Sequence, residues 1–302
     1  MKLNFLLLVI LKLSMANIMV TAQEYRFVEI QDGQLGFRTY GSGDPLLIIN
    51  GSPGNGSDDN IFLAKKLSKH FQTIIFDYRG TGASYINKID SNSITFEKMV
   101  TDIEKVRIGL GVKKWNVLGH GFGGLIATQY ASKYPENIKR LILSSTGWVN
   151  LEYLKQINLK INENLTQIER DSLRAIENKL TCGTISEFES KQRAKYLAKA
   201  YVFYSKFVDK VSEDIFNIDC EINSLLIKNL IQIKYDCSNQ FENFYKQTLI
   251  IHPKQGIIDK QITLKNYKIF KKSKIQYIEK CGHYPWLDNP DEFFRAVIEF
   301  LK

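Results

Sequence analysis

The stretch NVLGHGFGGLIA, residues 116–127, decides the fold. A short apolar run enters a glycine-rich turn, and the chain leaves that turn in a helical pattern of small and apolar residues. This order is that of the G-x-S-x-G motif, in which a serine at the tip of a sharp strand-to-helix turn is the nucleophile. The frame here reads GHGFG, residues 119–123, so Gly121 holds the place of the serine. The sequence therefore predicts the turn without its reactive side chain.

Strands and helices alternate on both sides of this turn, from residue 24 to residue 145. The runs YRFVEI and GQLGFRTY predict a hairpin around Asp32-Gly33. The runs PLLIIN and QTIIFD are short and almost continuously apolar, which is typical of parallel strands buried on both faces. NIFLAKKLSKHF and FEKMVTDIEKVRIGL, the second preceded by a Thr95 cap, have helical spacing. The alternation predicts an α/β fold with a mostly parallel, doubly wound sheet.

The pattern becomes helical after Gly147 and stays so to about residue 244. Capping-box signatures stand at residues 166–169 and 186–189. Strand patterns return at TLIIHP and KIQYIEKC, and a last helix begins near Asp291. We expect a signal peptide at 1–22, the first part of the core at 23–149, a helical lid at 150–246, and the second part of the core at 247–302.

The N-terminus has the features of a secretory signal. Lys2 precedes an apolar run that is interrupted at Lys12, and Val20-Thr21-Ala22 offers small residues to a signal peptidase. The run is too short and too interrupted for a membrane span. We expect cleavage after Ala22 and export to the periplasm or the medium, with no stable membrane span afterwards. An uncleaved N-terminal anchor is the alternative.

Composition limits the classes of partner. The 302 residues are 44% hydrophobic and 24% charged, as in ordinary globular proteins. The net charge of +9 comes without a nucleic-acid-binding motif, so we expect a solvated basic surface and no nucleic-acid partner. Because the histidines do not cluster and no C-x-x-C pair occurs, we expect no metal and no cofactor. The oligomeric state stays open, and so does the disulfide pairing of the four cysteines, Cys182, Cys220, Cys237 and Cys281.

Five loops follow successive predicted strands: IINGSPGNGS, FDYRGTGAS, LGHGFGG, LIIHPKQGIID and KCGHYPWLDNPDEF. In the second loop we expect Asp77 and Arg79 to pair and brace the corner. In order, content and spacing the five loops resemble the α/β-hydrolase fold, particularly the lidded group that includes proline iminopeptidases. The resemblance covers nearly the whole mature chain. It implies a nucleophile, an acid, a base and an oxyanion hole on these loops.

The resemblance places the nucleophile at Gly121, the acid at Gly256 and the base at His283. Two of the three positions are therefore glycine, and we expect ordinary serine-hydrolase chemistry to be lost. The strained positive φ of this turn costs glycine nothing, so Gly121 would leave the turn intact. The implied oxyanion donors are the backbone N–H groups of Gly51 or Ser52 and of Phe122.

Some residues offer replacements for the missing groups. Asp259 lies three residues beyond the acid position, and a loop shift would make it a displaced acid for His283. Cys281, Ser84, Ser144 and Ser145 are weaker candidates for the nucleophile, because residues of these types in such places are more often structural. The residues expected to line a pocket under the lid are Tyr201, Tyr204 and Trp286. Family members that cleave an N-terminal proline bind its free amine with carboxylates of the lid. The resemblance implies that Glu187, Glu189 or Glu213 would have this role here.

Three functional interpretations follow. The first is a catalytically degenerate hydrolase-fold protein that binds a small molecule or peptide under its lid, or contacts another protein. The second is an active amide or ester hydrolase with a displaced acid and a non-standard nucleophile. The third is an interaction protein without a usable pocket. An open cavity favours the first two, and a hydroxyl or thiol within about 3.2 Å of the His283 ring favours the second.

Overall fold

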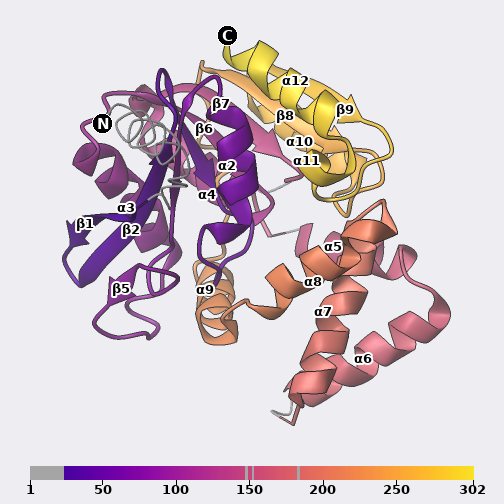
Figure 1. The fold of residues 1–302 in the computed structure, drawn as a ribbon. Helices are drawn as coiled ribbons and strands as arrows, with labels where there is room; N and C mark the ends of the chain where they lie inside the picture. The colour runs from indigo at the N-terminus through magenta and orange to yellow at the C-terminus, as the bar shows by residue number, and fades with distance from the viewer. Residues whose placement is uncertain (1–23, 147–148, 152, 182–183) are drawn as a thin grey trace, which may run out of the picture.

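The computed structural model describes residues 24–146, 149–151, 153–181 and 184–302 (Figure 1). Within them a nine-stranded sheet has the order β1-β2-β4-β3-β6-β7-β8-β9, with β5 paired to β2. The strands are β1 (Arg26–Ile30), β2 (Gly33–Tyr40), β3 (Pro45–Ile49), β4 (Gln72–Phe76), β5 (Tyr85–Ile86), β6 (Trp115–His120), β7 (Ile138–Ser144), β8 (Gln247–Pro253) and β9 (Ser273–Ile278). The predicted signal peptide, residues 1–22, lies outside the described residues, so its cleavage stays a prediction.

The predicted strands around the site are confirmed. β1 and β2 form the expected antiparallel hairpin, with Ile30 opposite Gly33. From β4 across the sheet to β9 all neighbouring strands pair in parallel. Their carboxyl ends therefore meet at one edge, where loops of a parallel sheet carry a binding site.

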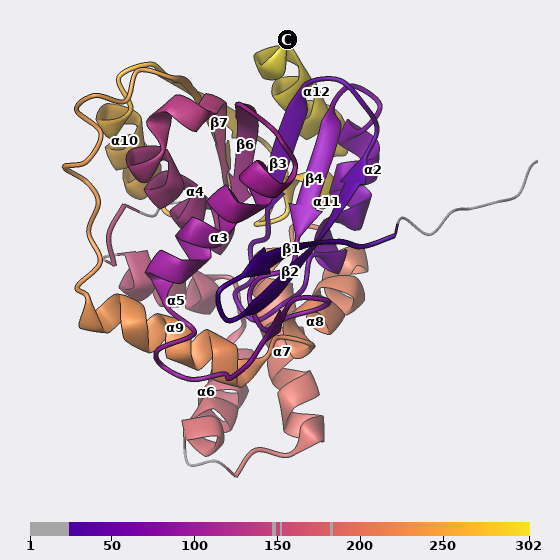
Figure 2. The ribbon, with the colours of Figure 1, turned by 90° about the vertical axis from the view of Figure 1, so that its left-hand side faces the viewer.

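Helices cover both faces of the sheet (Figure 2). Leu46 and Ile48 of β3 pack with α2 (Ile61–Leu67) and α12 (Pro290–Leu301). Leu47 and Ile49, which point to the other face, belong to the core formed with α3 (Phe96–Gly109), α4 (Phe122–Lys133) and α10 (Lys260–Ile269). This alternation confirms the doubly wound α/β fold.

The segment between β7 and β8 is helical, as the sequence indicates. Its helices are α5 (Tyr153–Glu163), α6 (Gln167–Thr181), α7 (Glu187–Tyr201), α8 (Val208–Phe216) and α9 (Cys220–Gln232). They gather below one end of the sheet, and we call them the lid (Figure 1). Ser186 and Glu189 form the capping box at the start of α7. Single-turn helices lie at Asp58–Asn60, Pro135–Asn137 and Ser205–Phe207, and α11 spans Pro285–Asp288. Among the helices of the described ranges, none is both long and apolar enough to cross a membrane.

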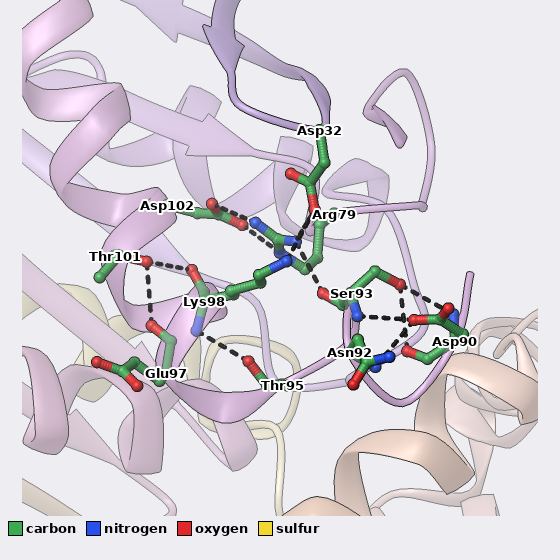
Figure 3. Close-up of polar contacts among 10 residues, drawn as sticks. All are labelled: Asp32, Arg79, Asp90, Asn92, Ser93, Thr95, Glu97, Lys98, Thr101 and Asp102. Atoms are coloured by element: carbon green, nitrogen blue, oxygen red, sulfur yellow. Dashed lines mark hydrogen bonds and ion pairs between the residues drawn. The ribbon is translucent and has the colours of Figure 1, made fainter. Parts of the chain in front are cut away.

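The expected pairing of Asp77 with Arg79 is wrong. The buried guanidinium of Arg79 donates to both carboxylate oxygens of Asp102 at 2.8 Å, and also to Asp32, which Lys98 contacts as well (Figure 3). The Asp77 carboxylate accepts from backbone N–H groups of the neighbouring loops instead. β4 ends at Phe76, and the turn that follows is closed by the Thr81 N–H, which donates to the carbonyl of Tyr78 at 2.9 Å, so Asp77 precedes the turn and Arg79 lies within it. The Arg79 ion pairs tie the corner to α3 and to the β1–β2 hairpin.

Candidate functional site

The turn between β6 and α4 has the geometry of a nucleophile elbow. Gly121 lies there with φ of 52° and ψ of −121°. A residue with a Cβ atom rarely adopts this conformation, whereas glycine adopts it without steric cost. The Gly121 N–H donates to the carbonyl of Ser144 on the neighbouring strand, at 3.0 Å. The turn of the motif is thus kept although its side chain is absent.

His283 lies directly across from this elbow, on the loop between β9 and α11. A Cβ atom built on residue 121 would come within 3.1 Å of His283 Nε2. The ring is buried, and burial lowers its pKa to about 3. Its Nδ1 atom, which an orienting acid would contact, has no hydrogen-bond partner in the described part of the chain. His283 is therefore a neutral imidazole, and no carboxylate of the described residues orients it.

The acid position carries no carboxylate. Gly256 lies in a turn after β8, where its N–H donates to the carbonyl of Pro253. Asp259 is the N-cap of α10 and accepts the N–H of Gln261 at 2.7 Å. Its other carboxylate oxygen faces Lys160 at 3.9 Å. In the described structure Asp259 therefore caps α10 and makes no hydrogen bond to Nδ1 of His283.

The substitute nucleophiles are also placed elsewhere. Cys281 is buried, which raises the pKa of its thiol, and Ser84 donates its hydroxyl to a backbone carbonyl. Ser144 and Ser145 are buried at the end of β7. None of these four side chains is on the wall of the cavity described below. Within the described residues no hydroxyl or thiol hydrogen-bonds the ring of His283.

Two of the expected oxyanion donors, the N–H groups of Ser52 and Phe122, already have acceptors within the protein. The Ser52 N–H donates to Asn50 Oδ1 at 3.2 Å. The Phe122 N–H donates to the carbonyl of Gly51 at 3.3 Å. Both distances exceed the usual 2.9–3.0 Å for such bonds, so they are weak bonds. The loop that would bind a developing oxyanion instead satisfies its own backbone.

A cavity of about 660 Å³ lies between the lid and the sheet. Its volume is in the range of small-molecule sites. Gly121 and His283 form part of its wall, and so does Tyr201 of α7. Two residues expected there lie elsewhere. Tyr204 follows the end of α7 and is 39% exposed, and Trp286 packs edge-on against the buried ring of His120.

The lid carboxylates considered for binding an amine do not reach this cavity. Glu187 pairs with Lys191 one turn along the surface of α7. Glu189 closes the capping box with Ser186, and Glu213 is exposed. No Asp or Glu is found among the described residues of the wall. The described wall of the cavity therefore has no acidic side chain that could pair with a free amine.

Asp288 was not singled out by sequence reasoning, because an acid in this motif looks like an ordinary helix residue. Its buried carboxylate accepts three backbone N–H groups, from Phe203 at 3.0 Å, Tyr204 at 3.1 Å and Gly282 at 2.9 Å. The approach is close: a Cβ atom on Gly282 would come within 2.3 Å of the Tyr201 carbonyl oxygen. Asp288 thus fixes the lid segment after α7 to the loop that carries His283.

The remaining candidates for chemistry are few. Cys220, Cys237 and Cys281 are free thiols, and Cys182 is outside the described residues. In the part of the chain that the structure describes, no three His, Cys, Asp or Glu side chains are grouped as metal ligands.

Comparisons with known proteins agree with this geometry. The family described as alpha/beta hydrolase fold matches residues 44–290. A proline iminopeptidase of Heyndrickxia coagulans is 22% identical over 91% of this chain and 98% of its own length. A cis-3-alkyl-4-alkyloxetan-2-one decarboxylase of Shewanella oneidensis is 25% identical over 91% and 87%, respectively. A solved α/β fold family hydrolase of Bacillus anthracis superposes with a TM-score of 0.75 at 16% identity, covering 92% of this chain and 99% of that one. The chain therefore belongs to the α/β-hydrolase fold family, and it is similar to proline iminopeptidases.

Proposed function

We propose that this protein no longer carries out serine-hydrolase chemistry and instead binds a small molecule or peptide beneath its lid. The observation that carries the proposal is the pairing of Gly121 at the elbow with a cavity that remains open beside it. The reacting side chain is absent, but the space in which a substrate would sit is kept.

The loss of catalysis follows from the requirements of acyl transfer. Such chemistry needs a nucleophile, a base and a group that holds the base in its tautomer. Gly121 has no side chain, and no carboxylate in the described part of the chain orients His283. In a well-studied triad, loss of that carboxylate's charge alone lowers turnover by ~10⁴. A protein that lacks the nucleophile and the orienting carboxylate retains only the rate enhancement that binding can supply.

The cavity argues for a binding role over that of an interaction protein without a pocket. Its walls come from both the lid and the sheet, and aliphatic side chains of the lid dominate it. The Asp288 carboxylate ties the lid segment after α7 to the loop that carries His283, and Tyr201 of α7 and His283 both line the cavity. Preformed, largely apolar cavities of this size are the usual form of a small-molecule site.

The test is whether an uncharged apolar dye enters the cavity. Ile227 of α9 lines the cavity, whereas Ile231, one turn further, is 57% exposed. We expect N-phenyl-1-naphthylamine to bind the wild type and the control I231W alike, seen as an increase in dye fluorescence. I227W fills part of the cavity and should weaken binding by about tenfold or more, the effect of ~1.4 kcal/mol. Equal binding by I227W would refute a ligand site under the lid.

We also propose that the protein is exported after cleavage at Ala22. The support is the pattern of Lys2, an apolar run and small residues before Gln23. N-terminal sequencing of the native protein should begin at or near Gln23. A mature protein that begins at Met1 contradicts export by a cleaved signal.

A further inference from the structure

Arg193 of α7 is the one charged side chain among the described residues that line the cavity. We infer that the cavity takes a molecule with a carboxylate head and an aliphatic tail, and that the carboxylate binds Arg193. This inference rests on the proposed binding function and names the chemical class of its ligand.

The guanidinium of Arg193 has hydrogen-bonding capacity that the described part of the chain does not use. Its Nε atom is buried and has no partner there. Oε1 of Glu177 is 3.8 Å from an Nη atom of Arg193, which is beyond hydrogen-bond length. Buried donors are normally paired, so this unpaired donor is a reason to expect an acceptor beside the Arg193 guanidinium, whose side chain is 31% exposed and lines the cavity.

The surroundings of Arg193 favour an anion. A second cavity of about 310 Å³ adjoins the first and shares Arg193 and Tyr201 with it. The described wall of this second cavity carries Arg170, Arg174 and Arg193 against the single carboxylate of Glu177. Arg193 therefore stands at the junction of the two cavities, where positive charge exceeds negative charge. A carboxylate is drawn to this junction, and an ammonium group is repelled.

The rest of the larger cavity suits an aliphatic chain. Arg193 precedes Tyr201 by eight residues of α7, which is about 12 Å along the helix axis. The Tyr201 ring contacts the His283 ring, with centroids 5.3 Å apart. A tail that starts at Arg193 thus runs toward the elbow, where Gly121 leaves room. The apolar side chains along this path include Leu154, Ile157, Ile215, Ile218, Ile227 and Ile257.

A carboxylate fits this site better than other anions. The planar guanidinium matches a carboxylate in a two-point contact and remains charged at any physiological pH. A phosphate monoester would bring close to two negative charges into an apolar space that holds one arginine, with Glu177 near it. Burying that second charge without a partner is strongly unfavourable. The ligand class is therefore a monocarboxylate with an apolar chain.

The experiment compares three molecules of equal chain length: laurate, dodecan-1-ol and dodecylamine, each measured by displacement of N-phenyl-1-naphthylamine. The variants are R193Q and R193K, with K195Q as the matched control. Lys195 is exposed on the same helix and does not line the cavity, so K195Q makes the same change of charge away from the site. A hydrogen-bonded charge pair of this kind corresponds to about tenfold or more in affinity.

We expect the wild type and K195Q to bind laurate at least about tenfold more tightly than dodecan-1-ol. R193Q should lose this preference while it binds dodecan-1-ol as the wild type does, which also shows that the variant is folded. R193K should keep part of the preference. Equal binding of laurate and the alcohol by the wild type, or tighter binding of the amine, overturns the assignment of the head group but leaves a ligand cavity. If none of the three molecules binds, the proposed function itself fails.

Discussion

Replacement of Gly121 by alanine measures how firmly the structure holds the elbow in its unusual conformation. At φ of 52° and ψ of −121° a residue with a Cβ atom is strained by about 1–3 kcal/mol. The new Cβ atom would also lie 3.1 Å from His283 Nε2, closer than an ordinary van der Waals contact, so the buried ring must shift by a few tenths of an ångström. We expect G121A to lower the free energy of unfolding by about 1–3 kcal/mol, toward the upper end of that range.

The assay is equilibrium unfolding in urea, followed by circular dichroism. G111A is the control, because Gly111 also has a positive φ, of 69°, but has no atom within 4 Å of the position of its added Cβ. G111A therefore reports backbone strain alone. Adding H283A to G121A should relieve the contact with the ring but not the strain, and a double-mutant cycle isolates that part. A neutral or stabilising G121A would refute the reasoning, since it would mean that residue 121 is not held at positive φ.

Three further outcomes follow from the site. G121S alone should hydrolyse p-nitrophenyl esters little faster than the wild type. G121S combined with G256D should give a higher kcat/KM, because Nδ1 of His283 then gains a carboxylate partner. Equal rates for the single and the double variant would show that the acid position is misassigned. Burial lowers the pKa of folded His283 to about 3, below the value near 6.5 of the unfolded chain, so its contribution to stability is complete above pH 6.5 and is lost as the pH falls toward 3. As the pH falls through this range, the free energy of unfolding of H283Q should decrease less than that of the wild type, with a difference of up to ~1.4 kcal/mol per pH unit. If the two proteins lose stability in parallel with pH, the lowered pKa of His283 is contradicted. D288A leaves three backbone N–H groups without their acceptor, so it should lower the free energy of unfolding in urea by about 2–4 kcal/mol and speed amide exchange in the segment after α7. Unchanged exchange there would exclude Asp288 as the anchor of the lid.

The layers of the fold were predictable because their signals are local. The apolar runs of β3 and β4, the Thr95 cap of α3 and the glycine-rich turn at Gly121 each depend on a few neighbouring residues. Arg79 shows where such reasoning ends. Its partner, Asp102, is 23 residues away on α3, and the choice between Asp102 and the nearby Asp77 depends on how the chain turns after β4.

The site was predictable only where a motif fixes a position on a strand end. Gly121 and His283 belong to such motifs, and the structure brings them together. The same sequence at Asp259 is compatible with a displaced acid and with a helix cap, and only the path of the chain into α10 decides for the cap. Tyr204 was expected on the cavity wall, but α7 ends at Tyr201, so Tyr204 does not continue the helix that carries Tyr201 to the cavity. Arg193 has no motif at all, and its place depends on how α7 packs in the lid.

The central claim is that the protein has a ligand cavity without serine-hydrolase chemistry. The measurement that tests it most directly is turnover of p-nitrophenyl butyrate by the purified wild type beside H283A, with intact-mass analysis after treatment with a serine-reactive fluorophosphonate. We predict no covalent adduct and the same slow rate for both proteins, at most roughly 10³–10⁴ over the reaction in water. Turnover at about 1–10³ per second that H283A abolishes, together with a phosphonate adduct on the wild type, would contradict the claim.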